Sequence, residues 1–149
     1  MAIMLFLLKR FRCTNKIDVL VVCGSVGLGF ACIENLFYVL QKSNWISTSI
    51  VRAINSVPGH FSYAIIMGYF VYRAFNIVQT KKQKFFNLSI ALILPILIHW
   101  NKNILYNNQR LLVFFISIVL LIIVLKILKK AREEAITKQQ IISNDTVIE

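Results

Sequence analysis

The sequence predicts an all-α membrane protein, a polytopic helix bundle with about four transmembrane helices and a short apolar stub at its N-terminus. Hydrophobic residues make up 58% of the 149-residue chain, which is more than in an ordinary soluble domain. Only 15% of the residues are charged, and they gather in short runs between apolar blocks. Each block is near the roughly 20 residues that a helix needs to cross a bilayer. Transmembrane β-strands are about half as long and alternate in polarity, so the blocks favour helices.

The pattern divides the chain into three parts. Residues 1–16 hold the apolar stub MAIMLFLL and a basic segment, and the stub is too short to span a bilayer. Residues 17–128 form the transmembrane domain, and residues 129–149 form a cytoplasmic tail that is expected to continue as a short amphipathic helix and then fray. The expected spans are residues 17–40, 50–72, 85–106 and 111–128. The polar stretch QKSNWISTS is typical of an outer interfacial loop.

Basic residues orient the expected bundle. The net charge is +11, and most Lys and Arg residues lie before the first span, between the second and third, and around the end of the fourth. By the positive-inside rule, both termini of this multi-pass protein of the cell (inner) membrane face the cytoplasm. Anionic lipid head groups of the bilayer are the expected partners of this charge, and no nucleic-acid partner is expected. The cysteines Cys13, Cys23 and Cys32 lack metal-ligand spacing and are interpreted as structural.

Three ionisable residues lie well inside the apolar blocks, away from their ends: Glu34 in the first span, His60 in the second and His99 in the third. Such residues inside a membrane are costly and by default indicate function. At 1.5 Å of rise per residue they lie roughly 9, 15 and 10 Å from the outer ends of their spans. Each one alone could be a packing residue that is satisfied by a hydrogen bond. Their shared depth in the outer half of the membrane favours one functional layer instead.

Helical spacing adds neighbours to this layer. Phe30, Glu34 and Tyr38 are spaced four apart and share one helix face, as do His99 and Asn103. Small residues in the first two spans would allow close helix packing; they are Gly24, Gly27, Gly29 and Gly68.

These residues resemble the motifs of the PrsW family of intramembrane proteases, whose wider clan includes the CAAX prenyl endopeptidases. The family's Phe-x-x-x-Glu-Asn-x-x-Tyr element is matched here by Phe30, Glu34, Asn35 and Tyr38. Its next element, an Arg followed by a His and a Gly, resembles Arg52, His60 and Gly68. Its last element resembles His99 with Asn103. The resemblance covers roughly residues 18–103.

The resemblance implies hydrolysis of a peptide bond in or near the membrane, with a membrane protein or peptide as substrate. It implies the catalytic residues Glu34, His60, His99 and Asn103, supported by Asn35, Tyr38 and Arg52. In a metal-free version, Glu34 is the general base, His60 orients the water, and the other two donate hydrogen bonds to the oxyanion. In a metal version, Glu34, His60 and His99 bind a divalent ion such as zinc. Analogy with the clan favours the metal-free version.

One family element has no counterpart, and two other functions stay open. The family's Glu-Glu pair on the preceding helix is missing, because no acidic residue precedes Asp18. We therefore expect this chain to be a fragment, to have a misplaced start or to be a degenerate member, and to be inactive or very weak by itself. The first alternative function is a b-type haem protein with His60 and His99 as axial ligands. The second is a proton-coupled carrier that uses Glu34 as its relay, although no internal repeat supports it.

Overall fold

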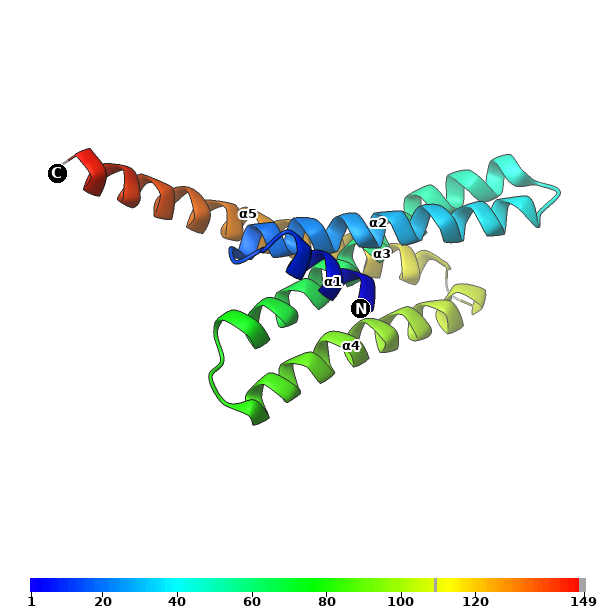
Figure 1. The fold of residues 1–149 in the computed structure, drawn as a ribbon. Coiled ribbons are helices and arrows are strands. Elements are labelled where there is room, and N and C mark those ends of the chain that lie inside the picture. The colour runs from blue at the N-terminus through cyan, green and yellow to red at the C-terminus, as the bar shows by residue number, and fades with distance from the viewer. Residues whose placement is uncertain (109, 148–149) are drawn as a thin grey trace.

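The computed structural model describes the backbone of residues 1–108 and 110–147 and the side chains of residues 1–100 and 111–144. Within these ranges the chain forms helices and no strand, which confirms the predicted all-α fold (Figure 1). The helices are α1 (Ala2–Arg10), α2 (Lys16–Leu40), α3 (Trp45–Asn76), α4 (Lys81–Asn108) and α5 (Arg110–Val147).

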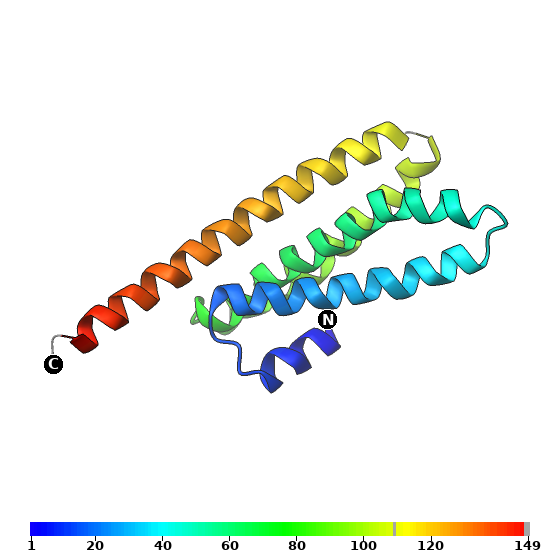
Figure 2. The same ribbon diagram turned by 90° about the horizontal axis from the view of Figure 1, so that it is seen from above.

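Helix α3 is the centre of the bundle. The helices α2, α4 and α5 all pack along it, whereas α2 and α4 bring no Cα atoms within 8 Å of each other in the described part of the chain. Figure 2 shows α5 along one side of the bundle and α2 along the other, with α3 between them. A residue on α3 can therefore contact α2 and α4 at once.

Small residues set the close approach of α2 and α3. A Cβ atom on Gly27 would overlap the Cβ atom of Ala64 and would lie 2.7 Å from the carbonyl oxygen of His60. A Cβ atom on Gly68 would lie 2.8 Å from the Sγ atom of Cys23. These two glycines therefore let the helix backbones approach more closely than larger residues would allow.

The other two predicted packing glycines differ from each other. A Cβ atom on Gly24 would lie 2.8 Å from the ring of Phe61, so Gly24 also lies at the helix contact. The prediction for Gly29 is wrong, because nothing lies within 4 Å of the position that its Cβ atom would take. Gly29 lies on the exposed face of α2, where no neighbouring helix requires a small residue.

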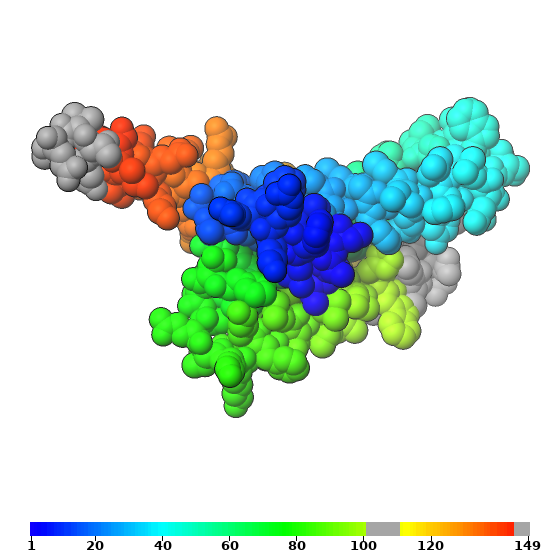
Figure 3. Space-filling model, in the orientation of Figure 1, coloured from blue at the N-terminus to red at the C-terminus, as the bar shows by residue number. Residues whose placement is uncertain are grey.

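The N-terminal stub forms α1, which packs across the bundle. Its side chains Met4 and Leu8 lie one turn apart and are buried. They join a cluster with residues of three other helices, namely Val19, Cys23, Ala64, Val71 and Ala91. The opposite face of α1 exposes Ile3 and Phe6. In the space-filling view α1 lies over α2 and reaches α4 (Figure 3).

Three helical segments among the described residues are long and apolar enough to cross a membrane: Lys16–Leu40, Lys81–Trp100 and Leu111–Asn144. The expected span at residues 50–72 lies in α3, which is not one of them. Its polar residues, such as Arg52, lower its hydropathy. Because α3 is the central helix, these polar groups can face protein rather than lipid. That α3 crosses the membrane stays a prediction, based on its 32 residues and its central position.

Two helices extend beyond the spans expected from the sequence. Helix α3 begins at Trp45, so half of the expected outer loop is helical. The hydroxyls of Ser47 and Ser49 donate to the carbonyl oxygens of Asn44 and Trp45, and such bonds keep serine compatible with a helix. Helix α5 continues through the expected tail as far as Val147, so this helical segment is longer than the short one expected. Its 38 residues rise about 57 Å at 1.5 Å per residue, and Figure 2 shows it extending beyond the other helices.

The three basic runs of the sequence lie at one end of the bundle, called the basic end below. Lys16 at the start of α2 forms an ion pair of 3.1 Å with Glu134 of α5, and its ammonium lies 5.9 Å from the ring of Tyr69 on α3. The ammonium of Lys84 on α4 lies 4.2 Å from the ring of Phe75 on α3. The loop between α2 and α3 lies at the opposite end (Figure 1).

Candidate active site

A polar cluster joins α2, α3 and α4 away from the basic end. Oε2 of Glu34 on α2 lies 2.6 Å from Nε2 of His60 on α3. The imidazole centroids of His60 and His99, which lie on α3 and α4, are 5.3 Å apart. Glu34, His60 and His99, which the sequence predicts to lie at a similar depth in the membrane, therefore lie close together in the structure. Their meeting depends on the close helix approach at Gly27, whose neighbour is the carbonyl group of His60 itself.

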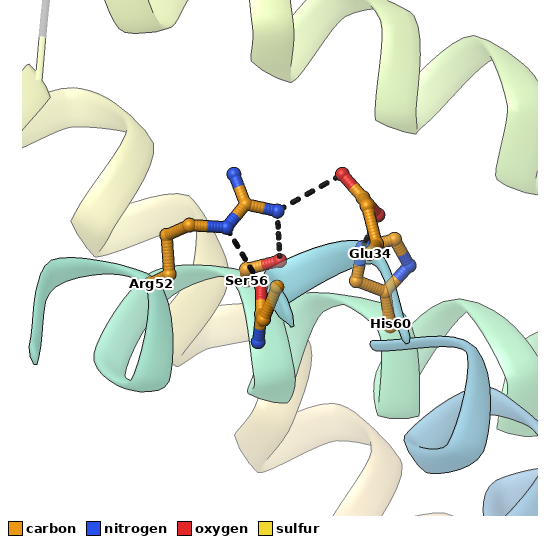
Figure 4. Close-up of polar contacts among 5 residues, drawn as sticks. Glu34, Arg52, Ser56 and His60 are labelled. Carbon is orange, nitrogen blue, oxygen red and sulfur yellow. Dashed lines mark hydrogen bonds and ion pairs between the residues drawn. The ribbon is translucent and has the colours of Figure 1, made fainter. Parts of the chain in front are cut away.

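Arg52 on α3 holds the α2 side of the cluster in place (Figure 4). Its Nη2 atom donates to Oε1 of Glu34 at 3.0 Å and to Oγ of Ser56 at 3.3 Å. Its Nε atom donates to Oδ1 of Asn35 at 2.7 Å. The guanidinium carbon lies 3.7 Å from the ring centroid of Tyr38, which is a cation–π contact. One arginine thus connects the expected supporting residues to Glu34.

The two carboxylate oxygens of Glu34 have different neighbours. Oε1 accepts a charge-assisted hydrogen bond from Arg52, a strong kind of bond. Oε2 is buried and close to His60, but no hydrogen bond to it has suitable angles, so this is a close polar contact rather than an aligned hydrogen bond. The side chains of Glu34 and Arg52 are only 22% and 18% exposed. Loss of either partner would leave a poorly solvated charge behind.

Aromatic rings lie beside the imidazoles. The ring centroid of Phe30 lies 5.2 Å from that of His60. The ring of Tyr63 lies edge-on to both imidazoles, with its centroid 6.1 Å from that of His60 and 5.8 Å from that of His99. Tyr63 and Ser56 were not among the residues predicted from the sequence. Helical spacing could have found them, because Ser56 follows Arg52 by four residues and Tyr63 follows His60 by three.

Asn103 is the one predicted site residue that the structure does not place at the level of its side chain. It lies on α4, four residues after His99, but outside the described side chains. Its expected role as an oxyanion donor stays a prediction.

The arrangement defines a class of protein first: a polytopic helical membrane protein with a carboxylate and two imidazoles gathered within its helices. The family model described as "PrsW family intramembrane metalloprotease" matches residues 1–128. The chain belongs to this family, and the match includes α1.

Curated relatives agree with this assignment. The chain is 34% identical over 96 residues to Protease PrsW of Clostridioides difficile, covering 62% of this chain and 40% of the relative. It is 39% identical over 85 residues to Protease PrsW of Oceanobacillus iheyensis, covering 57% and 37%. It is 31% identical over 110 residues to Protease PrsW of Halalkalibacterium halodurans, covering 68% and 49%. The chain thus spans between a third and a half of the length of these relatives. No solved structure matches it.

The family description implies a metal, so we tested whether the described side chains fit one. No group of three His, Cys, Asp or Glu residues among them is arranged to hold a metal ion. Arg52 occupies one oxygen of Glu34, and its positive charge would repel a cation at this position. Nε2 of His60 faces the other oxygen of Glu34. In this arrangement Glu34, His60 and His99 do not fit a metal, and no chemical step is derived through one.

The two alternative functions gain no support. A bis-histidine haem needs a ring nitrogen of each histidine on the iron, but Nε2 of His60 lies against Glu34. Nothing in the family match or among the relatives indicates a carrier.

Proposed function

We propose that this chain carries the catalytic layer of an intramembrane peptidase, which hydrolyses a peptide bond of a membrane protein or peptide in or near the bilayer. The observation that carries the proposal is the contact between Glu34 and His60, held by Arg52, within the part of the chain that matches the family. A carboxylate next to an imidazole is a common arrangement for moving a proton in catalysis.

Each side chain of the cluster has a proposed role in the reaction. A water molecule beside Oε2 of Glu34 and the imidazole of His60 gives a proton to this pair as its oxygen attacks the carbonyl carbon. The pair then returns the proton to the amine nitrogen as the C–N bond breaks. Arg52 and Asn35 keep Glu34 in one position, which matters because small misplacements slow such reactions strongly. His99 and Asn103 are the proposed donors to the oxyanion.

Glu34→Gln tests this proposal. The substitution keeps the shape of the side chain but removes its ability to take a proton. The assay uses a chimera that carries the family's Glu-Glu helix before Met1, so that every family element is present. The chimera should cleave an apolar membrane peptide, and Glu34→Gln should lower the rate by about 10²–10⁴-fold, the usual contribution of a general base.

The matched control is Glu133→Gln, which changes an exposed acidic side chain of α5 and should leave cleavage unchanged. Circular dichroism should show the same helicity in all variants. Full activity of Glu34→Gln would mean that Glu34 only orients its neighbours.

We also propose that both termini face the cytoplasm of the cell, so that the site lies in the outer half of the membrane. The gathering of Lys16 and Lys84 at one end of the bundle supports this orientation, because basic residues favour the cytoplasmic side. Alkaline phosphatase fused after Asn44 should be active, and the same enzyme fused after Gln83 should not. The reverse result would place the site in the inner half.

A further inference from the structure

Tyr63 is a buried residue of the site for which the proposed mechanism has no role. Its side chain belongs to α3 and is only 6% exposed. Its ring lies edge-on to the imidazoles of His60 and His99, at interplanar angles of 76° and 86°. Its hydroxyl is buried and has no hydrogen-bond partner among the residues that the structure describes. Tyr63 thus brings an unused polar group to the place where two histidines meet.

A structural role does not explain this hydroxyl. A buried polar group without a partner destabilises the fold, and phenylalanine would fill the same space without that cost. Native proteins contain few such groups, and the exceptions often have a functional reason. Aromatic side chains on a helix lean toward its N-terminus, over the residues three and four positions earlier. The ring of Tyr63 therefore extends toward His60 and away from the basic end.

We propose that the Tyr63 hydroxyl is a catalytic hydrogen-bond donor that finds its partner only when substrate is bound. The inference rests on the proposed peptidase function and adds a residue to it. The hydroxyl donates to the carbonyl oxygen of the peptide bond that is cleaved, and the bond strengthens as that oxygen gains negative charge. Such a donor works best in a site that excludes water, and the burial of Tyr63 and His60 provides one.

The test is Tyr63→Phe, which keeps the ring and removes only the hydroxyl. In the chimera used above, kcat should fall by about 10²–10³-fold, the usual effect of losing one oxyanion donor, while KM changes little. The midpoint of thermal unfolding should stay the same or rise, because the hydroxyl has no hydrogen-bond partner among the described residues. The matched control is Tyr72→Phe, another tyrosine of α3, which should leave both quantities unchanged.

A second measurement does not depend on turnover. The probe is an apolar hexapeptide in which a hydroxyethylene group replaces the central amide, so that its secondary alcohol imitates the tetrahedral intermediate. The 149-residue protein in detergent micelles should bind this probe at least tenfold more tightly than its Tyr63→Phe variant does. The Tyr72→Phe variant should bind it as the unchanged protein does.

The possible outcomes separate this inference from the function on which it rests. Full activity of Tyr63→Phe, when Glu34→Gln is inactive, would overturn the role of Tyr63 and leave the peptidase function standing. A fall of several degrees in the unfolding midpoint of Tyr63→Phe would also overturn it, because the hydroxyl would then be a structural donor. If the chimera cleaves nothing, the peptidase function is contradicted. If the 149-residue protein and its Tyr63→Phe variant bind the probe equally, or if neither binds it, the Tyr63 inference is overturned as well.

Discussion

The two halves of the interface between α2 and α3 differ in polarity. The half nearer the basic end is apolar, and Gly27 and Gly68 bring the backbones together there. The other half is polar, and Glu34, Arg52 and His60 face one another across the same two helices. Helices in a membrane gain no hydrophobic driving force from each other and rely on close packing and hydrogen bonds. In this interface, close packing joins the helices in the half nearer the basic end, and hydrogen bonds join them in the other half.

The two halves of the interface have different roles. Close packing at the glycines sets the distance between the backbones, and the polar half uses that distance to bring Glu34 within 2.6 Å of His60. Gly27 lies where the two halves meet, because its neighbours are the apolar Ala64 and the carbonyl group of His60. Changes in the packing half should therefore reach the site, whereas changes confined to the polar half should leave most of the packing intact.

The largest effect is expected from Gly27→Leu. A side chain at this position must push α3 away, and overpacking of this kind costs about 1–3 kcal/mol and occasionally more. Peptide cleavage by the chimera should be lost together with stability, because Glu34 and His60 separate. The matched control is Gly29→Leu, which meets no neighbouring atom and should preserve both. Unfolding midpoints and cleavage rates of the two variants check the prediction, and similar behaviour of the two would argue against it.

Arg52→Lys should have the next largest effect. Lysine keeps the charge but cannot reproduce the planar fork that reaches Glu34 and Asn35 together. The lost hydrogen bonds should cost about 1–3 kcal/mol, and the looser carboxylate should slow cleavage by about 10²-fold. Denaturant unfolding and cleavage assays measure the two effects, with Lys42→Arg in the exposed loop as control. A variant as active as the original would mean that the charge of Arg52 matters and its geometry does not.

Ser56→Ala should have a smaller effect on the same network. It removes one acceptor, at 3.3 Å from Nη2 of Arg52, and leaves the bonds to Glu34 and Asn35 in place. Stability should fall by about 0.5–1.5 kcal/mol, and cleavage should fall less than for Arg52→Lys. Measurement of both variants in one assay tests this order. A larger loss in Ser56→Ala than in Arg52→Lys would give the serine hydroxyl a direct role.

The smallest effect is expected at the basic end. Lys16→Gln removes the ion pair with Glu134, whose side chain is 48% exposed. Exposed pairs contribute about 0–1 kcal/mol, and salt screens them. Cleavage should be unchanged, and the small loss of stability should shrink further as the salt concentration rises. A marked loss of activity would mean that α5 couples to the site.

Much of the site could be predicted from the sequence because its residues are chemically conspicuous. An ionisable group in an apolar block is rare, so Glu34, His60 and His99 could be identified from the sequence alone. The rise of a helix per residue then predicted that they lie at a similar depth. Ser56 and Tyr63 were not predicted, because serine and tyrosine are common in membrane helices and gain meaning only from their neighbours. Gly29 was wrongly assigned to a helix contact, because spacing alone does not tell which face of α2 meets α3.

The sequence by itself determined the all-α membrane class, the basic runs and the three ionisable residues, because hydropathy and charge are properties of single residues and their order. The tertiary structure decided what depends on the relative placement of helices. It made α3 the central helix, packed α1 across α2, extended α5 to Val147 and assigned Arg52 to Glu34. The contact between Arg52 and Glu34 depends on the distance between the backbones of α2 and α3, and at Gly27 that distance is limited by the overlap that one additional carbon atom would cause.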